Sequence, residues 1–368
     1  MEIPHSPADL SSQWLTVALR KANALSAGAV KAFEPMPVER GKGFYGQIVR
    51  LKLTYDPPES GGPPTVIAKF SSGNPEMRQR PNTRASYERE VRFYQTIAVE
   101  STLPVPTCYH SSVDIESGWH VLLLEDLAPA RSGSRIDGCS LIEAETAIKH
   151  IAGFHAHWWE DPRLDNLEWL AVAPQVSDDA QLAELHQKWW PAFLREVGPE
   201  LPGIVMEIGE SLGEQRGSIA RHLFMERPRT LIHSDYQLEN LLFGVEATSF
   251  FVVDWQFAKR GRGIWDVAYF LSENLSPADR REVEMDLLRG YVRVLSDRGV
   301  STYSLEDAMR DYKLSLLHRL GALISTIAAM PFTEEQIKMH VDVLLPRTVS
   351  AILDHDAGSV LCGSQQGL

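Results

Sequence analysis

Apolar residues recur with a period close to two in the first third of the chain, which predicts β-strands there. Leu51 and Leu53 mark one strand, and a second runs through Val66-Ile-Ala-Lys-Phe70. The segment between them, Asp56-Pro-Pro-Glu-Ser-Gly-Gly-Pro-Pro64, has the composition of a loop. A further strand is expected over Trp119 to Leu124.

Elsewhere the spacing of apolar residues is that of helices. Ser140-Leu-Ile-Glu143 is a capping box that opens a helix to about Trp159. Other helices are expected over residues 6–24, 84–99, 276–291, 304–329 and 333–353, and a frayed tail after residue 355. We therefore predict an α+β protein with a small β-rich N-terminal lobe, residues 1–127, led by a helix, and a larger, mostly helical C-terminal lobe, residues 128–368.

Composition and charge narrow the possible partners. The chain has 368 residues, 44% hydrophobic content and a net charge of −13 without a basic run, so no nucleic-acid partner is expected. Three scattered cysteines form neither a disulfide framework nor a zinc spacing, which suits a reducing, cytoplasmic location. Residues 1–10 lack the apolar core of a signal peptide, and no apolar run approaches the roughly 20 residues that span a bilayer. No membrane association is expected.

The most informative stretch is Leu231-Ile-His-Ser-Asp-Tyr-Gln-Leu-Glu-Asn-Leu-Leu-Phe243, followed by Phe251-Val-Val-Asp-Trp-Gln256. It places Asp235, Asn240 and Asp254 between apolar, strand-like residues that anchor a loop. Asp235 is the candidate base, or orienting carboxylate, for an acceptor hydroxyl. Asn240 and Asp254 offer the hard oxygen ligands that Mg²⁺ prefers, as in the catalytic loop of kinases. The alternative is three unrelated turn residues.

Two neighbours of this trio have expected supporting roles. His233 is predicted to brace the loop through backbone hydrogen bonds. Asp266, in Gly263-Ile-Trp-Asp-Val-Ala-Tyr269, is predicted to be a helix cap or a loop brace.

Gly41-Lys-Gly-Phe-Tyr-Gly46 matches the pattern G-x-G-x-x-G. A dinucleotide-binding fingerprint needs a helix after the glycines, but an alternating segment follows here. Strand-turn-strand fits a flap in which Gly41, Gly43 and Gly46 let backbone N–H groups approach nucleotide phosphates. An ordinary hairpin turn is the alternative.

Lys69 lies inside an apolar strand and matches the lysine that contacts the α- and β-phosphates of a nucleotide. The alternative for Lys69 is an edge-strand lysine that favours solubility. A phosphate-binding lysine needs a carboxylate to orient it, and the helix from Arg84 offers Glu88 and Glu90.

The stretch Leu122-Leu-Leu-Glu-Asp-Leu127 lies where the two lobes join. An adenine could bond to the backbone of such a connector, and Glu125 and Leu127 are the candidates. Candidates for the apolar walls of an adenine site are Ala68, Leu242 and Val253, although each could equally belong to the core.

On these motifs the chain resembles the aminoglycoside phosphotransferase/choline kinase superfamily, whose loop reads H-G-D-x-x-x-x-N, and is most similar to its ecdysteroid-kinase-like branch. The supporting segments are the loop itself and residues 90–94, 124–127, 155–159, 254–256 and 265–270. The resemblance implies a bilobal protein-kinase-like fold and ATP- and Mg²⁺-dependent phosphorylation of a small-molecule hydroxyl. It favours Glu90 as the partner of Lys69. Ser234 stands where the family usually has glycine.

The acceptor is less well defined. Trp158, Trp159, Trp189 and Trp190 precede the loop, in the region where the resemblance implies an acceptor pocket. Tryptophan pairs could form the base of a pocket for a steroid-like alcohol or enclose a quaternary ammonium group through cation–π contact. They could also simply belong to the core. An aminoglycoside-type antibiotic kinase is an alternative. A nucleotide-binding pseudokinase is another, disfavoured because Lys69, Asp235, Asn240 and Asp254 are all present.

Overall fold

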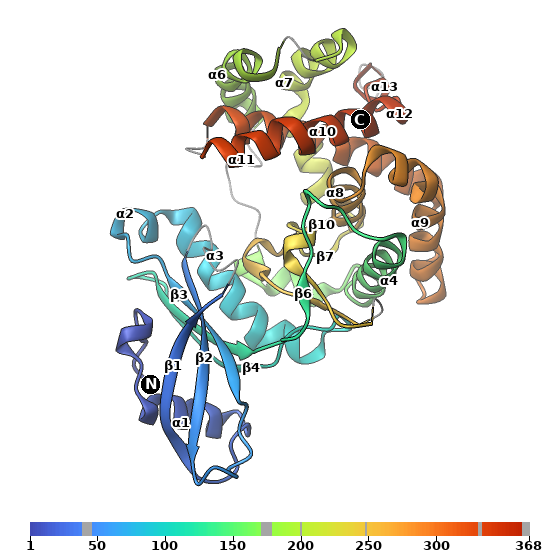
Figure 1. Ribbon diagram of the computed structural model, residues 1–368. Coiled ribbons are helices and arrows are strands. Elements are labelled where there is room, and N and C mark those ends of the chain that lie inside the picture. Colours follow the sequence, from blue (N-terminus) through green and yellow to red (C-terminus); the bar gives the residue numbers. More distant parts are fainter. Residues whose placement is uncertain (39–45, 171–178, 199–200, 247–248, 330–332, 363–368) are drawn as a thin grey trace. The chain divides into compact units, whose positions relative to one another are not determined.

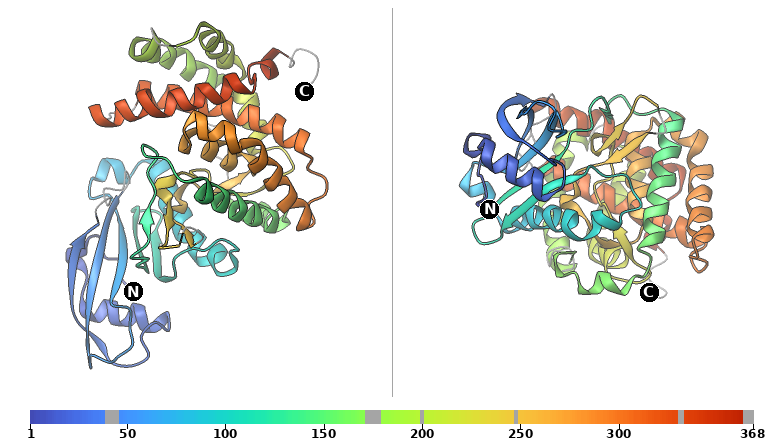
Figure 2. Two further views of the ribbon diagram at one scale, coloured as in Figure 1. Left: turned by 45° about the vertical axis from the view of Figure 1, so that its right-hand side comes forward. Right: turned by 90° about the horizontal axis from the view of Figure 1, so that it is seen from below.

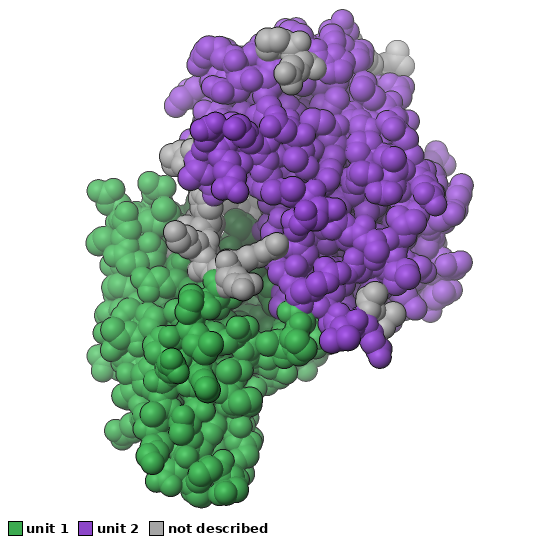
Figure 3. Space-filling view, in the orientation of Figure 1, with its two compact units in different colours: residues 1–130, 251–257 green, residues 131–250, 258–368 purple. Residues whose placement is uncertain are grey.

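The computed structural model describes residues 1–38, 46–170, 179–198, 201–246, 249–329 and 333–362. The chain forms two compact units, residues 1–130 with 251–257 and residues 131–250 with 258–368 (Figure 3). The segment Phe251–Phe257, which the sequence assigns to the C-terminal lobe, groups with the first unit.

The first unit contains an antiparallel five-stranded sheet of order β1-β2-β3-β5-β4 (Figure 1). Its strands are β1 Ala29–Pro37, β2 Gly46–Asp56, β3 Thr65–Ser71, β4 Cys108–Asp114 and β5 Trp119–Glu125. The apolar pattern indicated β2, β3 and β5. It does not indicate β4, where six of the seven residues are half-buried and neither face stands out. Most of β1 is exposed, and it ends on two prolines within three residues, as an edge strand tolerates.

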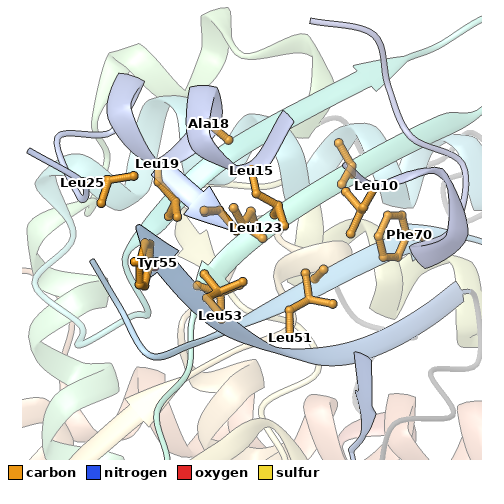
Figure 4. Packing of buried hydrophobic residues seen from close by; sticks show 14 residues of the cluster. Leu10, Leu15, Ala18, Leu19, Leu25, Leu51, Leu53, Tyr55, Phe70 and Leu123 are labelled. Atoms are coloured by element: carbon orange, nitrogen blue, oxygen red, sulfur yellow. The ribbon is translucent and has the colours of Figure 1, made fainter. Parts of the chain in front are cut away.

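Helix α1, Ser12–Lys21, covers one face of this sheet (Figures 1, 2 and 4). Leu15 and Leu19 of α1 pack with Phe70 and Leu123 of the strands, and all four are at least 98% buried. The helix expected over residues 6–24 does not start at residue 6, where only a 3₁₀ turn forms, η1 Pro7–Asp9. Leu10 is extended, so α1 begins later, where the Ser11 hydroxyl accepts the N–H of residue 14.

Further helices complete the first unit. They are α2 Pro75–Arg78, α3 Pro81–Arg92, its π-helical and 3₁₀ continuations η2 Phe93–Ile97 and η3 Ala98–Glu100, and the 3₁₀ turn η8 Trp255–Phe257. The helix expected over residues 84–99 is therefore present and begins earlier, at a proline in its first turn.

The second unit is mostly helical, as expected. Its longer helices are α4 Leu141–His157, α6 Asp179–Val197, α7 Gly203–Phe224, α8 Ile264–Asn274, α9 Pro277–Asp297, α10 Leu305–Ala329 and α12 Leu345–Asp354. Shorter ones are η4 Pro162–Asn166, η5 Glu168–Leu170, η7 Leu238–Asn240, α11 Glu334–Lys338, η9 Met339–Leu344 and α13 Ser359–Cys362. The capping box at Ser140 and Glu143 is confirmed. Helix α13 corrects the expectation that the chain is frayed directly after residue 355.

Short strands flank the loop that carries Asp235. Strand β7 Thr230–Ile232 pairs with β10 Lys259–Gly261, and β6 Arg131–Ser132, β8 Leu241–Phe243 and β9 Phe250–Val252 form a second sheet of order β6-β8-β9. The loop leaves β7 and enters β8, so both of its ends are fixed by buried strands. The α+β fold class is confirmed. Within the described ranges, no helix combines the length and apolar character needed to cross a bilayer.

Candidate active site

Lys69 meets two carboxylates inside the first unit. The neighbouring residues Ala68 and Phe70 face the cluster under α1, so the alternation of β3 directs Lys69 to the opposite face of the sheet. Its Nζ lies 2.5 Å from Glu90 Oε1 on α3 and 3.5 Å from Asp254 Oδ1. Ala68 is therefore core rather than part of a wall on the side of Lys69.

The choice between the two glutamates of α3 is also clear. Glu90 is 2% exposed and pairs with Lys69, whereas Glu88 pairs with Arg92 one helical turn further on, at 3.4 Å. The structure thus pairs Lys69 with Glu90, the partner that the resemblance favours, and also places Asp254 beside Lys69, a contact that the sequence does not predict.

Burial and charge act in opposite directions on this cluster. Burial disfavours the ammonium of Lys69, but the carboxylates of Asp254 and Glu90 outweigh it and raise the pKa of Lys69. Burial raises the pKa of Glu90 despite the attraction of Lys69. Lys69 is therefore a permanent cation held at a defined position, which is what phosphate oxygens require.

Asp254 sits in a segment that α3 holds in place. Asp254 has a φ of 67°, in the left-handed region, and its Oδ2 accepts a hydrogen bond from Gln256 Nε2 at 3.1 Å. The next residue, Trp255, is buried and stacks on Phe93. Arg89 Nη1 donates to the Gln256 carbonyl at 2.7 Å. The unusual backbone of Asp254 is thus supported from both sides.

A small cavity adjoins Lys69 and is lined by Gly46, Gln47, Ile48, Phe70, Tyr87, Glu90, His120, Asp254 and Gln256. His120 is neutral there, because burial and the nearby Lys69 lower its pKa to about 3. Gly46 is explained by packing alone, since a Cβ at this position would lie 2.2 Å from the Phe70 carbonyl oxygen. Gly41 and Gly43 lie outside the described residues.

The connector after β5 has restricted hydrogen-bonding options. The N–H of Glu125 donates to the Thr107 carbonyl at 2.8 Å, so an adenine at Glu125 would use its carbonyl oxygen. The Leu127 carbonyl accepts the N–H of Ala130 at 2.9 Å, so an adenine at Leu127 would use its N–H. This pattern is compatible with the predicted roles of Glu125 and Leu127.

In the second unit, Asp235 and Asn240 are joined directly. The Asn240 side chain is buried, and its Nδ2 donates to both the backbone oxygen and Oδ2 of Asp235 at 2.9 Å. Because the amide nitrogen is engaged in this way, the amide oxygen is the atom that Asn240 presents to a cation. Gln237 Nε2 is a second donor to Asp235 Oδ2, at 3.2 Å.

Asp266 braces this loop, as the sequence predicts. It is fully buried, and its two oxygens accept the backbone N–H groups of His233 at 2.7 Å and Ser234 at 2.8 Å. His233 Nδ1 accepts the N–H of Asp235 at 3.3 Å, which is the predicted bracing role. Ser234 has a φ of 69°, and this left-handed backbone explains why glycine is favoured at its position.

Sequence reasoning missed one contact of Asp235. The hydroxyl of Tyr269, on α8, lies 3.0 Å from Asp235 Oδ1. Tyr269 falls three residues after Asp266, in a segment already singled out. No local spacing connects it to Asp235, which lies 34 residues earlier.

The apolar candidates have different surroundings. Leu242 is the half-buried residue of β8, between two buried neighbours, so its side chain remains a candidate wall of a ligand site. Trp158 is 1% exposed and belongs to the core. Trp190 is half-buried, stacks on Phe193 and fills the space beside a glycine of α7. Trp159 lines a separate open cavity of the second unit with residues 298–302.

The oxygen types of the two predicted metal ligands suit Mg²⁺ carried by a nucleotide. Among the residues that the structure describes, no group of three or more histidine, cysteine or acidic side chains could hold a metal alone. Mg²⁺ is typically bound through one or two protein oxygens together with substrate phosphates rather than by a dedicated cage. Asp254 and Asn240 supply oxygens of that type.

Comparison with known proteins agrees with this chemistry. The model of the family described as "Phosphotransferase enzyme family" matches residues 67–301, nearly two thirds of the chain. A comparison with curated protein sequences found no match.

Solved structures of phosphotransferases share the fold. A putative aminoglycoside phosphotransferase from Ralstonia eutropha JMP134 is 16% identical with a TM-score of 0.55, covering 95% of this chain and 98% of that chain. Ethanolamine kinase from Plasmodium vivax is 13% identical with a TM-score of 0.55, covering 97% and 93%. The GDP complex of wild-type aminoglycoside 2'-phosphotransferase-IIIa is 12% identical with a TM-score of 0.52, covering 93% and 100%. The protein-kinase-like fold is confirmed, and the chain belongs to the phosphotransferase enzyme family.

Proposed function

We propose that this phosphotransferase moves the γ-phosphoryl group of ATP, in the presence of Mg²⁺, to a hydroxyl group of a small molecule. The observation that carries the proposal is the placement of Lys69 between Glu90 at 2.5 Å and Asp254 at 3.5 Å. A buried cation with two carboxylates, on the face of β3 away from the α1 core, has no obvious packing role.

In this proposal the first unit holds the nucleotide. Lys69 contacts the α- and β-phosphates, and Glu90 keeps its ammonium group in place. The connector residues Glu125 and Leu127 hold adenine through their backbone, while Leu242 of the second unit is a proposed wall. Asp254 and Asn240 are the proposed protein ligands of Mg²⁺. When bound, the ion neutralises phosphate charge.

Asp235 of the second unit orients the acceptor. Its carboxylate accepts a hydrogen bond from the acceptor hydroxyl and so aims the oxygen at phosphorus. Because phosphoryl transfer is largely dissociative, the hydroxyl proton passes to Asp235 late, and positioning supplies most of the rate enhancement. Asn240 contributes by fixing the carboxylate through its amide nitrogen.

For the acceptor we propose an apolar, steroid-like alcohol or an amino alcohol. The support is the likeness of residues 90–94, 155–159 and 265–270 to the ecdysteroid-kinase-like branch. Tyr269, which contacts Asp235, has the guanidinium of Arg319 3.7 Å over its ring. That ring face is therefore not open to a quaternary ammonium group.

A two-stage experiment tests the proposal. Thermal unfolding is followed with MgATP, MgGTP and ATP plus EDTA, and ADP release is then screened over a library of sterols, terpenoid alcohols, amino alcohols and aminoglycosides. We expect MgATP to raise the melting temperature, and at least one alcohol to accelerate ADP release. Absence of any shift with either nucleotide would contradict nucleotide binding and with it the proposed reaction. Acceleration by aminoglycosides alone would contradict the proposed acceptor class.

A further inference from the structure

We propose that Tyr269 is a positioning residue for the reaction: its hydroxyl donates a hydrogen bond to Asp235 and fixes the carboxylate that receives the acceptor. The inference rests on the proposed function for its catalytic meaning. The contact itself does not depend on which alcohol is phosphorylated.

The geometry places donors at both oxygens of Asp235. The Tyr269 hydroxyl is 3.0 Å from Oδ1, while Asn240 at 2.9 Å and Gln237 at 3.2 Å reach Oδ2. Gln237 Oε1 is also 3.1 Å from the Tyr269 hydroxyl. Donors at opposite oxygens prevent rotation of the carboxylate about its Cβ–Cγ bond, so its plane is set before an acceptor arrives.

A buried charge network holds Tyr269 in turn. The guanidinium of Arg319, on α10, lies 3.7 Å from the centre of the Tyr269 ring. Arg319 Nε donates to Glu273 Oε1 at 2.9 Å, and Glu273 is fully buried on α8, four residues after Tyr269. Arg135 contacts the same glutamate at 3.4 Å. The ring is thus clamped by a cation whose own position is fixed, so its hydroxyl cannot easily move away from Asp235.

The hydroxyl can act only as a donor toward Asp235. Burial and the nearby carboxylate of Asp235 raise the pKa of Tyr269 well above its usual value, although Arg319 and Arg135 oppose them. The phenol therefore keeps its proton near neutral pH. A donor of this kind favours the ionised carboxylate over the protonated one.

A Tyr–Asp contact elsewhere in the second unit offers a matched control. Tyr303 donates to Asp311 Oδ2 at 2.9 Å, and Tyr303 and Tyr269 are 4% and 5% exposed. Tyr303→Phe and Tyr269→Phe each remove one oxygen from a buried tyrosine bonded to a carboxylate. The stability costs should be similar. An effect on Asp235 that occurs only in Tyr269→Phe therefore reports the lost hydrogen bond to Asp235 rather than general destabilisation.

The first test needs no acceptor. The protein is labelled with ¹³C at aspartate side-chain carboxyls, and the resonance absent from Asp235→Asn identifies Asp235. Its titration is then followed in wild type, Tyr269→Phe and Tyr303→Phe. Loss of one hydrogen bond to the ionised form should raise the midpoint by about one pH unit in Tyr269→Phe only. The other titratable or charged side chains of this neighbourhood, Arg135, Arg319, Glu273, Glu239, Asp266 and His233, are not substituted in that variant.

A second variant guards against a folding failure of Tyr269→Phe. Arg319→Lys keeps a positive charge beside Glu273 but removes the planar contact with the ring, and it should raise the Asp235 midpoint by less. An unchanged midpoint in every folded variant at Tyr269 or Arg319 would overturn the proposal. So would an equal rise in Tyr303→Phe.

The kinetic test uses the alcohol that most accelerates ADP release in the library. Tyr269→Phe should lower kcat by about tenfold to a hundredfold and leave the KM for MgATP unchanged. It should also move the acid limb of the pH profile of kcat to higher pH. Tyr303→Phe should change none of these. If no alcohol is phosphorylated, the proposed function fails while the carboxyl titration still decides the Tyr269 contact. If an alcohol is phosphorylated and kcat is unchanged in Tyr269→Phe, only the positioning role fails.

Discussion

The indole of Trp255 stacks on the ring of Phe93 with centroids 3.8 Å apart and planes within 7° of parallel. Trp255 directly follows Asp254, and Phe93 lies three residues after Glu90 at the end of α3. The stack therefore joins the segment of the proposed metal ligand to the helix that orients Lys69. It also accounts for the grouping of residues 251–257 with the first unit.

Phe93→Ala should both destabilise the protein and weaken its binding of MgATP. Phe93 is fully buried, and removal of a buried aromatic ring costs about 3 to 5 kcal/mol. We expect that loss in urea unfolding, accompanied by weaker MgATP binding, because Trp255 loses its support beside Asp254. Val99→Ala, at an 80% exposed position further along the same helical stretch, is the control and should stay within about 0.5 kcal/mol of wild type. Undiminished MgATP affinity in Phe93→Ala would show that the stack does not position Asp254.

Lys69→Met should give a stability loss that grows with pH. Burial already raises the pKa of Glu90, and removal of the ammonium raises it further. A carboxyl with a raised pKa in the folded state supports folding when protonated, so its contribution is present below the unfolded pKa and lost as pH rises through the folded value. We expect a small penalty near pH 4 and about 3 kcal/mol near pH 8, measured by urea unfolding.

The double variant Lys69→Met/Glu90→Gln provides the control for this prediction. It removes the carboxylate of Glu90 together with the ammonium of Lys69, so most of the pH-dependent loss of stability should disappear. A penalty that is equal at both pH values in the single variant would mean that Glu90 is not left as an unpaired buried carboxylate.

The sequence predicts those parts of the candidate site that depend on short spacings along the chain. Asp235 and Asn240 lie in one loop between two strands, and the five-residue interval sets their hydrogen bonds. Lys69 was identifiable because a lysine interrupts an apolar strand. Such features depend on local backbone geometry, which the order of residue types expresses directly.

Other features of the site and of the fold depend on contacts between segments that are distant in the sequence, and these contacts leave no local signature in the sequence. Tyr269 meets Asp235 across 34 residues, and Phe93 meets Trp255 from another element. Ala68 was expected as a candidate wall of a ligand site, yet strand alternation turns it toward α1. Strand β4 lacks an apolar face, so only pairing with β5 defines it.

Ser234→Gly should be tolerated, whereas Ser234→Val should not. A side chain at a φ of 69° costs about 1 to 2 kcal/mol of stability, and glycine removes this cost. The extra freedom of glycine in the unfolded chain offsets about 0.5 to 1 kcal/mol of that gain. Thermal unfolding should therefore show Ser234→Gly equal to wild type or slightly more stable. Valine is worse because its branched Cβ is poorly accommodated there. Ser234→Ala separates the hydroxyl from the backbone effect. A clear destabilisation by glycine would be at odds with backbone strain at this position.

Asp266→Asn should loosen the loop that carries Asp235. Both carboxylate oxygens accept backbone N–H groups, from His233 and Ser234, and an asparagine amide can accept only one of them. Leaving a buried N–H against an amide nitrogen costs about 1 to 3 kcal/mol. We expect that loss in urea unfolding and faster amide exchange at residues 233–235. Asp279→Asn, at an exposed cap of α9, serves as the reference change. Unaltered exchange at residues 233–235 would argue against the bracing role.

In the proposed mechanism, Asp235 orients the acceptor hydroxyl while other residues hold the nucleotide. The most direct measurement is single-turnover transfer of labelled phosphate from ATP to the acceptor, made in parallel with MgATP affinity, for wild type and Asp235→Asn. The proposed mechanism predicts that Asp235→Asn binds MgATP with nearly unchanged affinity and transfers phosphate at least about a thousandfold more slowly. Transfer at the wild-type rate by Asp235→Asn would contradict the claim.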